Sequence, residues 1–178
     1  MSSDPSTEEV GTREPLNTAV RRARDMLAQG VPARTLLSHL TATVESLSPG
    51  TVASILVLDR EGLLRNGASP NLPADYLDAI DRLRPDANVG TCAAAAATGE
   101  IVVTPDFQAD GRWAELRHLP MALGYHSAWS MPIKAQDGRV LGTFGTYFRD
   151  RREPTARERE TVAKLVPLAA AAISGAAA

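Results

Sequence analysis

The sequence of 178 residues contains one cysteine, Cys92, so no disulfide can form within the chain and packing must hold the fold together. It also lacks an excess of charge. The formal net charge is −2, which gives no general attraction to nucleic acid or to anionic membrane surfaces. No apolar run reaches the roughly 18 residues that a membrane span requires, and residues 1–10 do not resemble a signal peptide. We therefore expect a cytoplasmic protein that binds neither nucleic acid nor membranes.

Motifs of several enzyme classes are missing as well. The sequence has no C-x-x-C or H-E-x-x-H spacing that would hold a metal, no G-x-S-x-G elbow and no glycine-rich phosphate loop. No motif specifies a cofactor, and we expect neither a metal site nor a set of catalytic residues. These absences favour a binding protein over an enzyme.

The length and the apolar content of 44% suit a single domain with one core. Residues 1–13 are polar and predict a disordered N-terminal segment, which leaves residues 14–178 as the domain. Helical spacing of apolar residues predicts three long helices, two at the start of this domain and one at its end. Their approximate ranges are residues 16–30, 36–47 and 155–173. Thr155 and Glu158 fit a capping box at the start of the last helix.

Between these helices the pattern changes to that of β-strands. A continuous apolar run rich in β-branched residues, 52–59, predicts the central strand of a sheet. Asp137-Gly138 predicts a hairpin that joins the last two strands. Shorter strands are expected from Leu63 and over residues 101–104. This order predicts an α+β fold: an antiparallel sheet of five to six strands, with the N- and C-terminal helices on one face.

Three stretches of the second half resemble the GAF domain, a family of small-molecule-sensing modules. Gly90-Thr91-Cys92, with Thr98-Gly99-Glu100 after it, resembles the family's helix and turn before the third strand. Residues 129–133 resemble its fourth strand and residues 137–144 its fifth. The resemblance extends over nearly the whole chain from the Leu16 helix onward. Members of the family usually carry glycine after the cysteine, where this chain has Ala93.

The resemblance implies a GAF-like fold with a ligand pocket on the sheet face that the terminal helices leave open. It also implies a small-molecule ligand, a homodimer formed through the terminal helices and a signalling role. The predicted elements use up the sequence by Ile173, so we expect the output to be a separate signalling protein. The alternative is that the chain is part of a longer protein.

We place this pocket between the sheet and the connecting segments 89–97 and 107–125, which are too long for tight turns. Its expected wall combines small side chains with most of the scarce aromatic residues, a composition that suits an apolar cavity with a few polar anchors. The predicted ligand-binding residues are Cys92, Phe107, Trp113, His126, Trp129, Phe144 and Tyr147. Strand alternation places Trp129 and Ser130 on opposite faces, and the sequence leaves open which of them faces the pocket.

Two alternative functions concern single side chains. Cys92, near a helix start, could have a lowered thiol pKa and serve a thiol-dependent enzyme or redox sensor, as in the sulfoxide reductases of this family. One thiol cannot both attack a sulfoxide and resolve the product, and a buried Cys92 is the simpler interpretation. His118 or His126 could bind haem iron in a haem-binding sensor, although such a histidine more often caps a loop or satisfies a carbonyl.

Overall fold

The protein is described by a computed structural model that gives the backbone of residues 5–177 and the side chains of residues 14–176. Of the segment predicted to be disordered, residues 1–13, the backbone of residues 5–13 belongs to α1, and residues 1–4 lie outside the described part. The helices are α1 (Pro5–Ala28), α2 (Ala33–Leu47), α3 (Ala74–Ile80), α4 (Cys92–Thr98), α5 (His118–Ala122) and α6 (Ala156–Ala177), with a short 3₁₀ helix, η1 (Gly111–Trp113). The strands are β1 (Val52–Leu58), β2 (Leu64–Ala68), β3 (Val102–Thr104), β4 (Ser127–Lys134) and β5 (Val140–Phe148).

These strands form one antiparallel sheet in the order β2-β1-β5-β4-β3, which confirms the predicted α+β fold. The hairpin predicted at Asp137-Gly138 joins β4 to β5. The prediction that residues 52–59 form the central strand is wrong, because β5 lies at the centre and β1 lies beside it. β1 has the apolar run of an interior strand because it pairs with β2 on one edge and β5 on the other.

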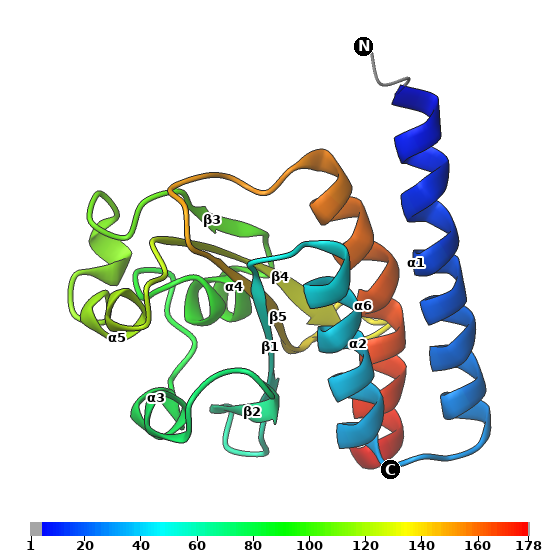
Figure 1. The fold of residues 1–178 in the computed structure, drawn as a ribbon. Coiled ribbons are helices and arrows are strands. Elements are labelled where there is room, and N and C mark those ends of the chain that lie inside the picture. Colours follow the sequence, from blue (N-terminus) through cyan, green and yellow to red (C-terminus); the bar gives the residue numbers. More distant parts are fainter. Residues whose placement is uncertain (1–4, 178) are drawn as a thin grey trace.

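Three helices cover one face of the sheet (Figure 1). α2 and α6 pack directly on the strands, and α1 lies outside them as a further layer. The buried side chains of this side form the largest apolar cluster, which includes Leu36, Leu40 and Leu165. The predicted apolar stripes of the three helices therefore serve one core, between the helices and the sheet.

The capping box at the start of α6 is confirmed in both directions. The backbone N–H of Glu158 donates to Thr155 Oγ1 at 3.1 Å, and the backbone N–H of Thr155 donates to Glu158 Oε1 at 2.9 Å. Both of these N–H groups would otherwise lack a partner at the helix start. None of the helices in the described part of the chain has the length and apolar content needed to span a lipid bilayer.

Candidate functional site

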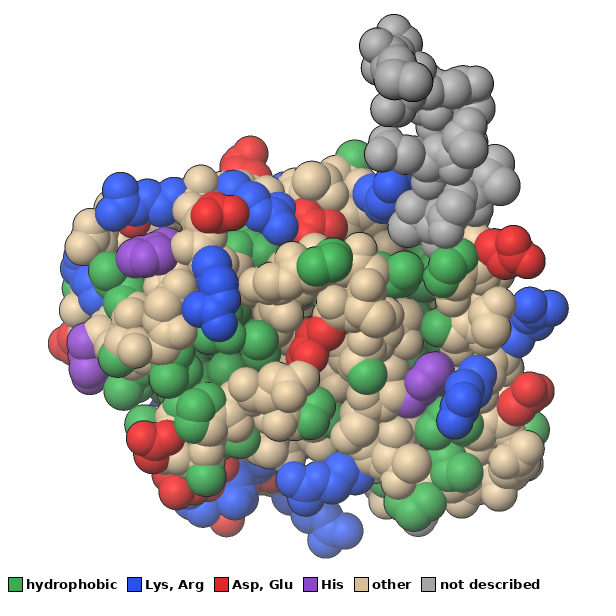
Figure 2. Space-filling model, viewed as in Figure 1, with side chains coloured by type: hydrophobic (Ala, Val, Ile, Leu, Met, Phe, Trp, Pro, Cys, Tyr) green, Lys and Arg blue, Asp and Glu red, His purple; other side chains and the backbone are tan. Residues whose placement is uncertain are grey.

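The other face of the sheet is covered by α3, α4, α5 and η1, the elements of the long connecting segments (Figure 1). Aromatic side chains form the centre of this cover: Tyr76, Phe107, Trp113, Tyr125 and Tyr147 belong to one buried cluster. Partly buried apolar side chains of α3 and α5 surround them, and Figure 2 shows hydrophobic side chains gathered over these two helices. This half of the molecule is thus a second core, built largely from loops and short helices.

A small cavity of about 20 Å³ lies inside this second core. Its wall combines β1 and β5 with α3, α4 and the segment from η1 to α5, and includes Tyr76, Cys92, Trp113 and Tyr147. A cavity of this size holds about one water molecule. None of the described residues that line it carries a charge. We call it the sheet cavity, and it occupies the place where the sequence predicts a ligand pocket.

Cys92 begins α4 and belongs to the wall of the sheet cavity. Its Sγ lies 3.0 Å from Ser130 Oγ, and that hydroxyl donates to Thr91 Oγ1 at 3.0 Å, so the thiol hydrogen is left to donate to Ser130. The residue is 8% exposed. Burial raises the pKa of the Cys92 thiol and outweighs the opposing effect of the neighbouring hydroxyl groups. The interpretation of Cys92 as a small buried side chain is confirmed, and the structure gives no lowered thiol pKa.

Small residues on the central strands let α4 approach the sheet closely. Ser130 of β4 pairs with Gly145 of β5, and a Cβ atom placed on Gly145 would lie 3.0 Å from Cys92 Sγ. That distance is tighter than nine in ten real Cβ contacts, so a side chain at this position would push Cys92 away by a few tenths of an ångström, and glycine favours the close packing of α4 on β5.

Two tyrosines join α3 to the sheet across the cavity. The hydroxyl groups of Tyr76 and Tyr147 are 2.7 Å apart, and their rings meet edge to face with centroids 6.0 Å apart. Burial raises the pKa of both side chains, so both stay protonated and one donates to the other. Tyr76 was not among the predicted site residues. Its signal in the sequence is a lone aromatic side chain on the apolar side of a short helical segment.

Trp113 forms a fixed wall of the sheet cavity. Its Nε1 donates to Thr104 Oγ1 at 3.2 Å, and its ring centroid lies 4.4 Å from that of Phe107. Thr104 Oγ1 in turn donates to Asp110 Oδ2 at 2.6 Å. Burial alone would raise the Asp110 pKa, but hydrogen bonds from Arg112 and Thr104 outweigh it and lower the pKa. The ionised Asp110 thereby holds the turn that positions Trp113.

The structure brings three of the seven predicted wall residues to the cavity: Cys92, Trp113 and Tyr147. Phe107 is fully buried behind Trp113. His126 is half-buried at the start of β4, where its backbone N–H and C=O bond Phe148 and Phe107, and His118 is exposed. Neither imidazole lines the sheet cavity.

Trp129 and Phe144 lie on the opposite face of the sheet, within the helix-covered core, so their placement in the pocket wall is corrected. The helix layer offers a larger apolar volume for bulky rings, whereas the pocket face of the same strands must stay flat enough for α4. Ser130 therefore lies on the α4 side of the sheet, where it bonds Cys92 and Thr91. Thr91 lines the sheet cavity, and neither Thr91 nor Ser130 was predicted as a site residue.

Comparison with known proteins agrees with this geometry. A family model described as "GAF domain" matches residues 31–174. The methyl sulfide methyltransferase-associated sensor of Methanosarcina acetivorans is 32% identical over 161 residues, which cover 90% of this chain. The chain spans only 16% of the length of that relative.

Solved structures share the fold at low sequence identity. A GAF domain from a phosphoenolpyruvate-protein phosphotransferase of Coxiella burnetii aligns with a TM-score of 0.74 and 17% identity, covering 92% of this chain and 95% of that one. Free methionine-R-sulfoxide reductase from Neisseria meningitidis, solved in complex with its substrate, aligns with a TM-score of 0.71 and 17% identity. That alignment covers 98% of this chain and 96% of the reductase.

Proposed function

The chain belongs to the GAF domain family, and from this premise we propose that it is a sensory domain that binds a small molecule in the sheet cavity. The observation that carries the proposal is the cavity itself, which is walled by connecting segments and lies on the face opposite the terminal helices. The name of the Methanosarcina acetivorans relative, a sensor, supports the same role.

The lining of the cavity supports a neutral, largely apolar or aromatic ligand with one or two polar groups. Aromatic and aliphatic side chains supply most of the wall, and the described lining residues are uncharged. A charged ligand would lose its hydration without gaining a counter-charge. Thr91 and Cys92 are the polar side chains of the lining besides Tyr76, Tyr147 and Trp113, and a polar group of the ligand would bond the Thr91 hydroxyl beside its present contact with Ser130.

Binding of such a ligand requires the cavity to expand. Its present volume of about 20 Å³ is smaller than any metabolite. The parts of the wall that can move are α3 and α5, which are short helices, whereas the sheet is held by ladders of hydrogen bonds. The bond between Tyr76 and Tyr147 joins α3 to β5, so ligand binding would break or replace it. Ligand binding would then shift the population from a closed to an open arrangement of these helices.

We further propose that the domain works in the cytoplasm as a homodimer that acts on a separate signalling protein. α1 is the outermost layer of the helix-covered side, so it is available to meet a second copy of the chain (Figure 1). Its buried residues Leu16 and Ala23 already pack within the chain, which leaves its outer side for that contact. Light scattering tests this part, since a monomer at tens of micromolar, on the order of a functional concentration, would contradict it.

The binding test combines native mass spectrometry with a cavity-filling variant. Protein purified from its own host should retain a small neutral molecule, or its melting temperature should rise with neutral aromatic or aliphatic metabolites. Leu119→Phe adds bulk to a residue of the cavity wall and should abolish binding. Leu123→Phe is the matched control, because Leu123 is a partly buried leucine outside that wall.

Retention of a ligand by wild type and by Leu123→Phe, but not by Leu119→Phe, would support the sensory role. Equal binding by all three proteins would place the ligand elsewhere. An oxidised or acylated Cys92 in place of a bound ligand would favour a thiol-dependent function, which the raised thiol pKa now opposes.

A further inference from the structure

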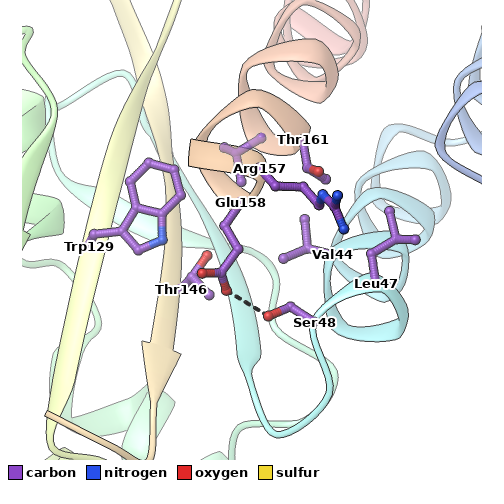
Figure 3. Close-up of a pocket in the computed structure, with 9 residues that line it drawn as sticks. Val44, Leu47, Ser48, Trp129, Thr146, Arg157, Glu158 and Thr161 are labelled. Carbon is purple, nitrogen blue, oxygen red and sulfur yellow. Dashed lines mark hydrogen bonds between the residues drawn. The ribbon is translucent and has the colours of Figure 1, made fainter. Parts of the chain in front are cut away.

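A second cavity lies on the helix-covered side of the sheet (Figure 3). Its volume is about 30 Å³, and it sits where the C-terminal end of α2 and the N-terminal end of α6 meet β4 and β5. Its wall includes Val44 and Leu47 of α2, Glu158 and Val162 of α6, and Trp129 and Thr146 of the sheet. We call it the helix cavity. The sheet separates it from the proposed ligand site.

Two polar atoms in the wall of the helix cavity have no hydrogen-bond partner among the described residues: Trp129 Nε1 and Thr146 Oγ1. Trp129 is fully buried, and Thr146 is 2% exposed. The two residues are directly opposite each other on β4 and β5, so their side chains lie on the same face of the sheet. Figure 3 shows the indole nitrogen on the edge of the ring that faces Thr146 and Glu158.

Buried polar groups in folded proteins almost always have a partner, because an N–H or O–H removed from water loses its hydrogen bonds. Here two such groups adjoin the same cavity, and no other protein group among the described residues reaches them. The two unpartnered groups beside the helix cavity therefore define the hydrogen bonds that its occupant must make. The occupant has to accept from the Trp129 N–H and exchange a hydrogen bond with the Thr146 hydroxyl.

The wall of the helix cavity contains one cationic side chain, Arg157, and one carboxylate, Glu158, so their charges balance and favour a neutral occupant. Glu158 is the carboxylate in the wall, and its oxygens already accept from Arg152 at 2.7 and 3.0 Å, from Ser48 at 2.6 Å and from the Thr155 N–H at 2.9 Å. The carboxylate is thus compensated and offers little to a cation. The two groups that need a partner are a neutral N–H and a neutral O–H, and the volume fits about one water molecule.

We propose that the helix cavity is a binding site for water, which accepts a hydrogen bond from Trp129 Nε1 and bonds Thr146 Oγ1. The bound water satisfies the two buried groups of the sheet beneath the ends of α2 and α6. This site is independent of the proposed ligand site, because it lies on the other face and shares no wall residue with the sheet cavity.

The direct test is a water–protein NOE measurement on the full-length, ¹⁵N-labelled chain. The two indole N–H signals are assigned with Trp129→Phe. The Trp129 indole N–H should show a cross-peak with a long-lived water molecule. The Trp113 indole N–H is the internal control and should show none, because its Nε1 is bonded to Thr104. A resolved Trp129 signal in the folded chain without any contact to water would overturn the proposal.

The stability of a Thr146 variant tests the same proposal, because the direction of the change depends on whether the cavity holds water. Thr146→Val removes the hydroxyl group and keeps the shape, so loss of the water bridge should raise the unfolding equilibrium constant by roughly two- to tenfold. If the cavity is dry, the same change removes an unpaired buried hydroxyl and should leave stability unchanged or increase it. The matched control is Thr143→Val. Thr143 is also buried on β5, but its side chain lies on the α4 side of the sheet near Cys92, and it lines neither cavity. Thr143→Val therefore measures the loss of a buried threonine hydroxyl away from the helix cavity, and Thr146→Val should destabilise the chain more than this control does.

A Thr146→Val variant with unchanged or increased stability would overturn the proposal. If Thr146→Val fails to fold, the NOE measurement on the unmodified chain still decides between a bound water and a dry cavity.

Discussion

Replacement of Glu158 by glutamine should destabilise the fold in a pH-dependent way. Glu158 is the junction of the helix-covered side: it closes the capping box of α6, binds Arg152 through both oxygens and accepts from Ser48 at the end of α2. Burial by itself raises its pKa, but the hydrogen bonds from Arg152, Ser48 and the Thr155 N–H outweigh burial and lower the pKa to about 2. The carboxylate therefore stabilises the folded chain only while it is ionised.

The size of the expected loss of stability follows from the difference between the folded-state and unfolded-state pKa of Glu158. A fall from the ordinary value of 4.5 to about 2 corresponds to about 3 kcal/mol of stability, since one pKa unit is worth roughly 1.4 kcal/mol. The side chain is 15% exposed, and glutamine keeps one acceptor oxygen, so we expect Glu158→Gln to cost about 2 kcal/mol at pH 7. Because the folded-state pKa is lower than the unfolded-state value of 4.5, this contribution is complete above about pH 5 and is lost as the pH falls toward 2.

Urea denaturation between pH 7 and pH 2.5 measures the effect. The difference in unfolding free energy between wild type and Glu158→Gln should be constant above about pH 5 and shrink below it. Glu160→Gln is the matched control: Glu160 lies on the same helix, but its side chain is 61% exposed and pairs with Lys164 at 3.3 Å, so its loss should cost close to nothing. A Glu158→Gln variant within 0.5 kcal/mol of wild type at pH 7, roughly the scatter of surface changes, would refute the reasoning.

Three further predictions concern the two cores. Leu40 and Leu165 are fully buried in the core between the helices and the sheet. Leu40→Ala or Leu165→Ala should each lower the unfolding free energy by about 2 to 5 kcal/mol in denaturant titrations. A loss below about 1 kcal/mol, on the order of a surface change, would contradict their role in the core. Tyr147→Phe leaves the Tyr76 hydroxyl without its partner and should speed amide exchange in α3 without unfolding the sheet; unchanged exchange over residues 74–80 would mean that the tyrosine bond does not hold α3. The Cys92 thiol should react with a thiol reagent far more slowly than it does in urea-unfolded chain, and equal rates would show that it is not protected.

Features set by neighbouring residues could be predicted from the sequence. The apolar stripes of α2 and α6, the capping box at Thr155 and the Asp-Gly hairpin each depend on a few consecutive positions, and all are present. The order of the strands could not be predicted in the same way. The apolar run of β1 indicates burial on both faces, but its place beside the central strand depends on pairings between distant segments.

The site residues show the same difference between features set by neighbouring residues and features set by distant segments. Cys92, Trp113 and Tyr147 were found because they combine a rare residue type with a connecting segment or a core strand. Alternation with a period of two separates Trp129 from Ser130 but does not say which of the two faces the helices. A pair of small residues, Ser130 opposite Gly145, distinguishes the face that α4 approaches, but it can be recognised only once the register of β4 and β5 is known.

The position of Trp129 directly beside Ser130 in β4 gives the protein an optical probe of its own. Ser130 belongs to the hydroxyl network at the sheet cavity, and the next residue along the strand carries an indole on the far side of the sheet. Trp113, the only other tryptophan, stands in the cavity wall itself. A chain that keeps only Trp129 would therefore detect movement of the strand without touching the ligand, and a chain that keeps only Trp113 would detect direct contact. The pair of single-tryptophan proteins would separate occupancy of the site from the mechanical response of the sheet, which is the distinction a biosensor built on this domain needs.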